Sequence, residues 1–366
     1  MRLALVHDSL CGTGGAEKVF QSIAKGFPSA DIFTFAYRPK LVDPYFQTRN
    51  IYTSMLNGVA GDMSLVRWLY PISTFAMQFL DLSSYDLIIS SSTTVAKHVH
   101  ARSVPHLCYC YYPPRALWDT DQYFTQDTLK SFFLRLFLPI LRSRDLSAFK
   151  RITHVVTQSL PAQTRIKQIY GVAPPIIPGP IATPNISASQ LLQPRQSFLI
   201  VSRLEEWKQL EHAIEAFNIL RKPLNIVGSG SFSRYLQSLN TSPFTRFLGW
   251  QSESQLQQLY LSSQALIFTP DLEYGITPLE ALHYGCPVIA FDSPGVRFTL
   301  LPYSTSIPSQ NYTSIHYSSQ SSLSLLSAIK LFSQVSFDPI FLNRYAARFS
   351  EESFLASLKS VVYSLV

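Results

Sequence analysis

The sequence contains few cysteines, little charge and no long apolar run. Its 366 residues include four cysteines, which form neither a CxxC pair nor a ligand spacing with histidine, so the sequence predicts no metal site and no disulfide framework. No stretch of about 18 uninterrupted apolar residues occurs, so we expect no transmembrane helix. The apolar run at the N-terminus meets His7 and Asp8 too early for a signal peptide. Together these absences favour a reducing compartment, the cytoplasm.

The residues that are present indicate a globular chain of two domains. Hydrophobic residues make up 46% of the sequence and charged residues 14%, which supports sizeable cores and excludes disorder. Strand-like and helix-like stretches alternate along both halves, and a proline-rich segment at Pro174–Pro194 separates the two runs. The pattern predicts two doubly wound α/β domains, at residues 1–180 and 195–344. Ligands of such sheets bind beyond the C-terminal strand ends, so the cleft between the domains is the expected site.

The net charge of +7 is unevenly distributed. Residues 1–180 hold 18 Lys and Arg against 11 Asp and Glu, a balance of +7, whereas residues 181–366 hold 12 of each kind. The first half is therefore expected to meet an anionic partner, although uneven charge can also serve solubility alone. Because no recognition-helix or stacking motif is present, we expect no nucleic acid. The favoured expectation is a peripheral position on an anionic membrane surface, at its inner face.

One segment of the first half combines basic and aromatic residues. Residues 130–151 contain six cations against one acid, Asp145, with phenylalanine and leucine between them, and Pro139 is expected to kink the segment. This pattern fits a basic amphipathic helix in a membrane interface. It fits equally well a pair of core-facing helices whose cations reach out to solvent.

Two cations of the second half stand just after a predicted strand. Arg203 and Lys208 follow SFLIV, and cations at the C-terminal end of a strand suit a diphosphate, whose charge they would stabilise. The competing interpretation is that they form surface ion pairs with Glu205, Glu206 and Glu211.

Glycines follow two of the predicted strands. Gly14 and Gly15 lie between the first strand and a helix, where glycine lets backbone N–H groups approach a phosphate. Gly228 and Gly230 follow LNIV in the second half. A plain tight turn explains each pair equally well, so both interpretations stay open.

The stretch TPLE, Thr277–Glu280, predicts the start of a helix. Thr277 can cap that helix, Pro278 suits its first position, and Glu280 completes a capping box. Capping accounts fully for these residue types, so the residues alone do not require Glu280 to bind a ligand.

Taken together, these motifs resemble family 4 of the glycosyltransferases, which have the GT-B fold, and most closely its bacterial mannosyltransferase-like branch. The resemblance covers most of the chain and is carried by LVHDSLCGTGGAEKV, YDLIISSSTTVAKHV, CYCYYPPRALWD, VSRLEEWKQLEHAIEAF, LNIVGSGS, FLGW and EYGITPLEALHYGCPVIAF. It implies two Rossmann-like domains facing a central cleft, with the acceptor on the first and the nucleotide-sugar on the second. It also implies that the last helix, at about 345–366, packs back on the first domain.

The resemblance implies roles for individual residues. Arg203 and Lys208 match the basic pair that holds the donor diphosphate, and Glu280 matches the glutamate that contacts the nucleotide ribose. Further donor-site positions are Gly14, Gly15, Gly228, Gly275, Ile276 and Thr277. Acceptor-side positions are Tyr111, Arg115, Trp118 and Asp119. No metal or cofactor is implied beyond the nucleotide-sugar co-substrate, for which GDP-mannose is the first candidate.

Two departures from the family pattern concern the chemistry. The family's first glutamate lies three residues before the glycine, where this chain has Leu272, flanked by Asp271 and Glu273. Leucine can neither hydrogen-bond the sugar nor support positive charge at its reacting carbon, so Glu273 becomes the catalytic candidate through a small backbone shift. A histidine that the branch places in the first domain is Tyr111 here, and a second is Thr93.

The expected function is metal-independent transfer of a hexose, with retention at the sugar carbon, onto a lipid-linked or polysaccharide acceptor. Leu272 and Tyr111 motivate an alternative, a catalytically weakened relative that binds nucleotide or glycan as a partner subunit. A sugar-nucleotide epimerase of the same fold fits the second-domain motif less well.

Overall fold

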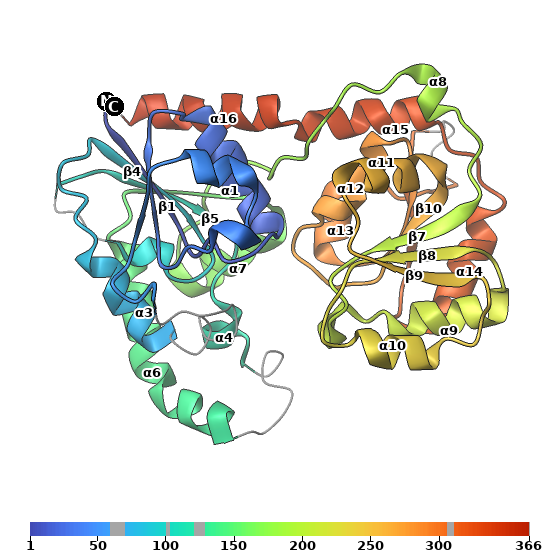
Figure 1. Cartoon of the computed structure of the whole chain (residues 1–366), viewed down its shortest axis with the longest axis horizontal. Coiled ribbons are helices and arrows are strands. Elements are labelled where there is room, and N and C mark those ends of the chain that lie inside the picture. The colour runs from blue at the N-terminus through green and yellow to red at the C-terminus, as the bar shows by residue number, and fades with distance from the viewer. Residues whose placement is uncertain (59–69, 100–102, 121–128, 306–310, 366) are drawn as a thin grey trace. The chain divides into compact units, whose positions relative to one another are not determined.

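The computed structural model describes residues 1–58, 70–99, 103–120, 129–305 and 311–365 (Figure 1). The chain divides into two compact units, residues 1–180 with 352–366, and residues 181–351. The division falls between Pro180 and Ile181, inside the proline-rich segment. Within the described ranges, no helix is both long enough and apolar enough to cross a membrane.

The first unit is built on a six-stranded parallel sheet in the order β3-β2-β1-β4-β5-β6. Its strands are β1 (Leu3–His7), β2 (Asp31–Thr34), β3 (Ile51–Thr53), β4 (Leu87–Ser92), β5 (His106–Cys110) and β6 (His154–Thr157). The strand order reverses between β1 and β4, as in other doubly wound Rossmann sheets. Ligands of such sheets bind beyond the strand ends at this reversal.

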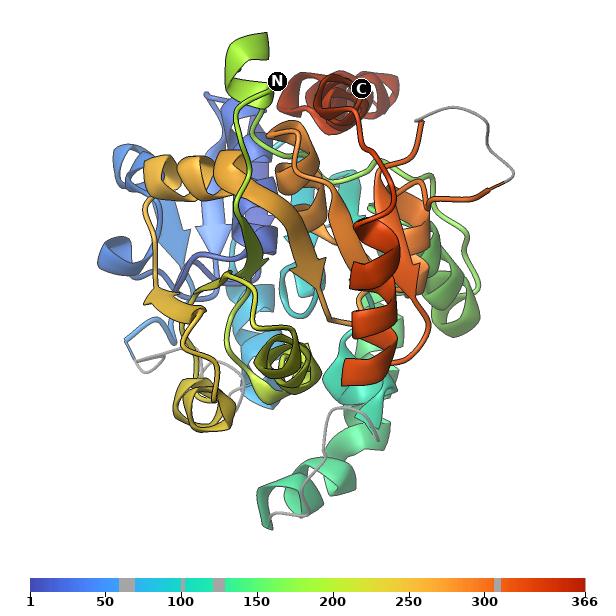
Figure 2. The same ribbon diagram turned by 90° about the vertical axis from the view of Figure 1, so that its right-hand side faces the viewer.

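Helices cover both faces of this sheet (Figures 1 and 2). They are α1 (Gly15–Gly26), α3 (Tyr70–Ala76), α4 (Arg115–Trp118), α6 (Leu129–Lys150), α7 (Leu160–Tyr170) and α16 (Glu351–Ser364), with short 3₁₀ turns that include η3 (Met77–Phe79) and η4 (Ala96–His98). The basic segment forms the single helix α6, which contains Pro139. Of the two alternatives, the pair of core-facing helices is therefore wrong in the number of helices, although α6 does contribute Leu138 and Leu141 to the core. The side chains of residues 130–136 lie outside the described part of the chain.

The last helix, α16, packs on the first unit. Its Phe354, Leu358 and Val362 recur at helical spacing and are buried. The Phe354 ring lies 5.6 Å from the ring of Tyr109 in β5. This spacing explains why the C-terminal residues contribute to the core of the N-terminal unit.

The second unit repeats the same architecture. Its parallel sheet has the order β12-β11-β10-β7-β8-β9, which reverses between β7 and β10. The strands are β7 (Ser197–Val201), β8 (Leu224–Val227), β9 (Thr245–Gly249), β10 (Ser263–Phe268), β11 (Val288–Phe291) and β12 (Ser314–Tyr317). The helices are α8 (Ala188–Leu191), α9 (Glu211–Leu220), α10 (Ser233–Leu239), α11 (Glu253–Ser262), α12 (Ile276–His283), α13 (Pro294–Thr299), α14 (Ser322–Phe332) and α15 (Pro339–Ala346).

Successive residues of β7 point to opposite faces of this sheet and into two different cores. Phe198 and Ile200 join the core that contains Phe217 of α9. Leu199, between them, joins the core that contains Leu279 of α12. A strand buried on both faces is an uninterrupted apolar run, which is why SFLIV was recognisable in the sequence.

Composition hides one strand of this unit, whereas a local motif marks one helix start. The stretch 309–324 has the serine-rich composition of a loop, but it contains β12, whose Ser314, Ile315 and Tyr317 are buried against β11. Composition does not reveal this strand because the burial of its serine and histidine depends on partners in the sheet. By contrast, Ser252 and Gln255 form a capping box at the start of α11, a motif that is visible in the sequence.

Candidate functional site

The loop after β7 carries both predicted cations. Arg203 is exposed and Lys208 is half-buried in the 3₁₀ turn η5 (Glu206–Lys208). Trp207 stands beside both, with its ring centre 5.8 Å from the Arg203 guanidinium carbon and 4.0 Å from Lys208 Nζ. Cation–π contacts of this kind contribute about 0.5–1 kcal/mol at exposed positions. Trp207 is not among the residues predicted from the sequence, where its place directly before the lysine is the one visible signal.

Gly228 and Gly230 hold this loop by close backbone contact. A Cβ atom on Gly228 would lie 1.9 Å from the carbonyl oxygen of Ser202, and one on Gly230 would lie 2.2 Å from that of Leu204. Gly228 also has φ of +126°, a conformation that L side chains rarely adopt. The backbone N–H of Leu204 donates to the Ser229 carbonyl at 2.9 Å. The glycines are therefore required by the packing of the two loops, whether or not Gly228 also meets a nucleotide.

The loops after β7 and β10 are joined at the reversal of the strand order. Thr269, which follows β10, donates from Oγ1 to the carbonyl oxygen of Lys208 at 2.7 Å. The side-chain amide of Gln320 donates to the Thr269 carbonyl at 2.9 Å. The fold thus brings the basic pair and the stretch after β10 to the same edge of the sheet, where doubly wound sheets bind ligands.

Leu272 occupies the turn after β10 as a packing residue. Its half-buried side chain packs against the core that includes Leu279 and Val296. Its carbonyl oxygen accepts from the Gly295 N–H at 3.1 Å. A Cβ on Gly295 would lie 2.1 Å from that oxygen and 2.5 Å from the carbonyl carbon of Glu273. The turn is therefore clamped on both its side-chain and its backbone side, which opposes a backbone shift at Glu273.

The start of α12 differs from the predicted capping box. The helix begins at Ile276, its N-cap is Gly275, and no side chain caps it. The predicted roles of Thr277 as cap and of Pro278 as first residue are wrong by two residues, because Gly275, with its extended backbone, is the N-cap and the helix begins earlier. The Gly275 Cα faces Phe268 and Pro278, and a Cβ there would lie 3.1 Å from Pro278 Cγ.

The Glu280 carboxylate has a hydrogen-bond partner in α11. Its Oε2 accepts a hydrogen bond of 3.2 Å from the hydroxyl of buried Tyr260. Burial and the nearby carboxylate raise the pKa of Tyr260 well above its ordinary value, so this phenol stays a donor. Tyr260 in turn stacks on Tyr284, with ring centres 5.4 Å apart. Glu280 is thus half-buried in a fixed orientation, and the capping alternative is excluded.

In the first unit, Gly14 and Gly15 lie at the start of α1. Gly14 is the N-cap with an extended backbone and gives no side-chain hydrogen bond, so the helix start has no side-chain cap. Helix N-termini favour anions through their free N–H groups and the helix dipole. The arrangement fits the predicted phosphate approach and fits a plain strand-to-helix turn as well.

Tyr111 is buried directly after β5. Its hydroxyl donates to the Ala16 carbonyl at 3.0 Å and lies 2.8 Å from Ser91 Oγ, which is 3.0 Å from Nδ1 of His7. Burial raises the pKa of Tyr111 well above its ordinary value. The residue that replaces the family histidine therefore ties α1 to the end of β4. An acceptor contact by Tyr111 stays a prediction.

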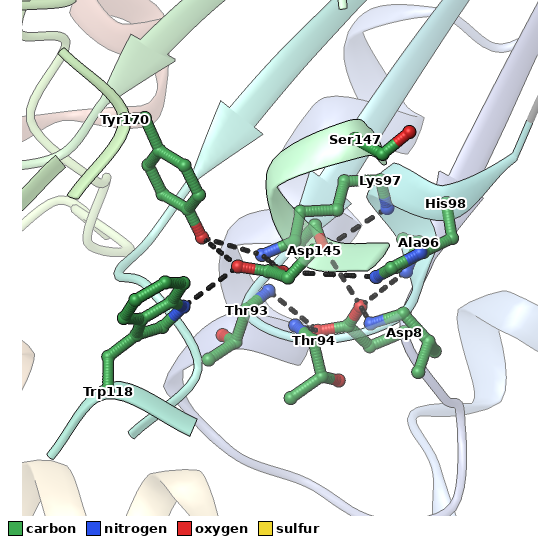
Figure 3. A network of polar contacts seen from close by, with 12 residues as sticks. Asp8, Thr93, Thr94, Ala96, Lys97, His98, Trp118, Asp145, Ser147 and Tyr170 are labelled. Atoms are coloured by element: carbon green, nitrogen blue, oxygen red, sulfur yellow. Dashed lines mark hydrogen bonds and ion pairs between the residues drawn. The ribbon is translucent and has the colours of Figure 1, made fainter. Parts of the chain in front are cut away.

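The other predicted acceptor-side residues lie on α4 and at its end, and Figure 3 shows Trp118 among them. Trp118 Nε1 donates to Asp145 Oδ2 at 2.8 Å, and Asp119 forms an ion pair with Arg165. Arg115 is half-buried, with its guanidinium carbon 4.9 Å from the ring centre of Tyr112. The segment is therefore held on its inner side by α6 and α7.

Asp145 is the centre of the buried network in Figure 3. Its carboxylate lies 2.8 Å from Lys97 Nζ and also accepts from the Tyr170 hydroxyl at 2.5 Å. Burial acts to raise the pKa of Asp145, but the Lys97 ammonium and the three donors Lys97, Tyr170 and Trp118 outweigh it and hold the pKa below its ordinary value. An ionised pair this deep is costly to desolvate and needs all these donors to persist.

Asp8 is a second carboxylate, and its role in holding a loop is not visible in the sequence. It follows β1 and accepts from the backbone N–H groups of Thr93, Thr94, Val95 and Ala96 at 2.6–2.8 Å (Figure 3). The loop after β4 is thereby wrapped around the end of β1. These hydrogen bonds anchor the loop, which carries Thr93 at the site of the family's second histidine.

The cysteines and the potential metal ligands of the described residues form neither a disulfide nor a metal-binding cluster. Cys11, Cys108, Cys110 and Cys286 are free and buried. In the part of the chain that the structure describes, no three His, Cys, Asp or Glu side chains gather to hold a metal ion.

Known proteins similar to this chain share its sequence pattern and its fold. The family model described as Glycosyl transferases group 1 matches residues 183–323. The alpha-1,3/1,6-mannosyltransferase ALG2 of Kluyveromyces lactis is 24% identical over 374 aligned positions, covering 82% of this chain and 71% of that protein. ALG2 of Dictyostelium discoideum is 24% identical, covering 82% of this chain and 84% of that protein. The structure of Anabaena Alr3699/HepE in complex with UDP-glucose matches with a TM-score of 0.70 at 16% identity, covering 100% of both chains.

Proposed function

We propose that the chain is a glycosyltransferase of the GT-B fold that transfers a hexose from a nucleotide-sugar to a glycan or lipid-linked acceptor, with retention at the sugar carbon. The observation that supports this most is the joining of the Arg203–Lys208 loop to the stretch after β10 by the Thr269–Lys208 hydrogen bond. It ties the loop that carries the two cations to the segment that leads into α12, whose start has no side-chain cap. Both features favour a bound diphosphate.

The proposed roles of the residues follow from charge. Arg203 and Lys208 stabilise the charge that develops on the nucleoside diphosphate as the sugar leaves. The backbone N–H groups at Ile276 and Thr277, behind Gly275, contribute the positive end of the α12 dipole. Glu280, held by Tyr260, accepts hydrogen bonds from the nucleotide ribose. Charge stabilisation by these groups needs no metal ion, so we propose metal-independent transfer.

The donor and the compartment are part of the same proposal. The name of ALG2 supports mannose as the sugar, and the UDP-glucose complex of Alr3699/HepE supports a nucleoside diphosphate hexose as the donor class. GDP-mannose and UDP-glucose are therefore the first two donors to test. Four free, buried cysteines fit a reducing compartment, the cytoplasm.

The test is transfer from a panel of nucleotide-sugars to lipid-linked and soluble glycan acceptors, with the anomeric product read by NMR. The Arg203→Ala/Lys208→Ala variant should lose at least about 100-fold in kcat, because each removed charge donor stabilises the transition state. Arg221→Ala/Lys222→Ala, which removes two exposed cations of the same unit, is the matched control. Absence of transfer and of donor hydrolysis with every nucleotide-sugar would refute catalysis.

A second candidate is a weakened relative that binds nucleotide or glycan as a partner subunit. The clamped position of Leu272 and the buried Tyr111 favour it, because neither side chain offers the family's usual group to a sugar. Leu272→Glu/Tyr111→His separates the two candidates. A large gain in transfer indicates a decayed site, and no gain at unchanged melting temperature argues for an adapted one. Melting must be measured alongside because both substitutions disturb buried contacts.

A further inference from the structure

Exposed apolar side chains gather on two neighbouring helical segments of the first unit. Each has between 48% and 71% of its surface exposed in the described structure; they are Ile72, Phe75, Phe79, Phe137 and Ile140. The first three belong to α3 and η3 and the last two to α6. Large apolar residues scattered singly are ordinary on a protein surface, but five on two adjacent segments are not.

Contacts and helical spacing place these residues on one surface. Phe75 touches α6 directly, with its ring centre 3.3 Å from the guanidinium carbon of Arg144. Phe137 and Ile140 lie seven and four residues before Arg144, on the same side of the helix. Leu138 and Leu141, on the adjoining stripe of α6, are buried in the core that also contains Ala76 and Met77. The exposed stripe of α6 meets α3 through the contact of Arg144 with Phe75, and the five residues define a patch, called here the α3–α6 patch.

Positive charge continues the α3–α6 patch along α6. Arg144 lies on the ring of Phe75 with its long side chain over apolar surface. One and two turns further on the same side come Ser147 and exposed Arg151, whose Nη1 is 3.3 Å from Ser147 Oγ. The sequence of the first 180 residues carries the entire excess of +7. Any occupant of the patch must therefore combine apolar surface with negative charge.

We propose that the α3–α6 patch inserts into the interface of an anionic lipid bilayer. Phe79 and Ile140, the most exposed of the five, enter the acyl boundary, and exposed Arg151 meets the phosphates. A second copy of the chain is a poorer occupant, because it brings a unit of the same charge to the contact. The proposal extends the membrane expectation from α6 alone to α3 and η3, whose exposed Ile72, Phe75 and Phe79 the sequence did not reveal.

The test is co-sedimentation of the full chain with vesicles, without nucleotide-sugar, so that its outcome is independent of transfer activity. Vesicles of phosphatidylcholine with 30% phosphatidylglycerol are compared with phosphatidylcholine alone, at 50 mM and 500 mM NaCl. The wild type should bind the anionic vesicles and release them as salt rises. Phe79→Ser/Ile140→Ser should bind at least tenfold more weakly, and Arg151→Gln should show a smaller salt dependence.

The matched control is Ile219→Ser/Leu323→Ser, which removes two apolar side chains of the second unit that are 64% and 73% exposed. This control should bind like the wild type. Equal binding by the patch variant, or equal loss in the control, would overturn the proposal. So would a dimer in sedimentation equilibrium that the patch variant abolishes while the wild type ignores vesicles, because the occupant would then be a second copy.

Discussion

At the scale of single residues, Leu272 is a packing residue at the position where the family pattern has a glutamate. The Leu272 side chain packs against the core, and the backbone of Gly295 lies close against the Leu272 carbonyl. The carboxylates on either side differ in exposure: Asp271 is exposed and Glu273 is half-buried. If the chain catalyses transfer, the support for charge at the sugar carbon must come from groups other than a carboxylate at 272.

Gly228 gives a first prediction, because its backbone leaves no room for a side chain. Gly228→Ala should destabilise the second unit by about 4 kcal/mol or more, since the added Cβ meets the Ser202 carbonyl oxygen at 1.9 Å and φ is +126°. Gly249→Ala is the control: its φ is also positive, at +68°, but nothing lies within 4 Å. It should cost about 1–2 kcal/mol. Urea unfolding measures both, and similar costs would contradict the close approach.

His98 predicts a pH dependence. Burial first, and then the Lys97 ammonium, lower the pKa of His98 to about 3. Below its ordinary pKa of 6.5, the unfolded chain binds a proton that the folded chain does not. The folded state therefore loses up to about 1.4 kcal/mol per pH unit as pH falls from about 6.5 toward about 3.

His98→Gln should remove this loss. Between pH 6.5 and pH 4.5, the slope of the free energy of unfolding against pH should fall by about 1.4 kcal/mol per unit relative to the wild type. His154→Gln, at an exposed histidine of the same unit, should leave the slope unchanged. A variant at 98 with the wild-type slope would mean that His98 is protonated in the folded protein.

At the scale of elements, the loop after β7 is positioned by its neighbours more than by its own sequence. The loop after β8 supports it through glycines, and the loop after β10 supports it through Thr269. The first helical turn of α12 and the Tyr260 hydroxyl of α11 likewise orient the Gly275–Glu280 stretch. The donor residues of the proposal thus depend on packing between four segments.

Thr269→Val tests this positioning. The change keeps the side chain's shape and removes the hydrogen bond to the Lys208 carbonyl, which costs about 1 kcal/mol. Because the Lys208 loop loses its tie to β10, the donor KM should rise several-fold, whereas the KM for the acceptor should not change. Thr269→Ser, which keeps the hydroxyl, should restore the wild-type donor KM. If Thr269→Val and Thr269→Ser changed the donor KM equally, the hydrogen bond would not be the cause of the change.

At the scale of the whole molecule, the chain forms two units with the same strand order, and α16 returns to the first of them. Three buried apolar side chains on one face of α16 contribute to that unit's core. Residues at the far end of the chain thereby stabilise the unit that begins it.

Leu358→Ala measures this contribution. Leu358 is fully buried, so its truncation should destabilise the first unit by about 2–5 kcal/mol. Calorimetry should show one unfolding transition lowered and the other unchanged, because the second unit has its own two cores. Ser357→Ala, exposed on the same helix, should move neither transition. Equal shifts of both transitions would show that the units unfold as one.

The sequence by itself determined the alternation of strands and helices, the two-unit organisation with its proline-rich boundary, and the positions of Arg203 and Lys208 after β7. These follow from local patterns: apolar runs buried on both faces, helical spacing, and cations at a strand end. Only the tertiary structure decided that Gly275 is the N-cap of α12, that Tyr260 holds Glu280, that Leu272 packs against the core and that β12 is a strand. Each of these depends on a partner far away in the sequence, and a local pattern cannot say which partner a half-buried residue will meet.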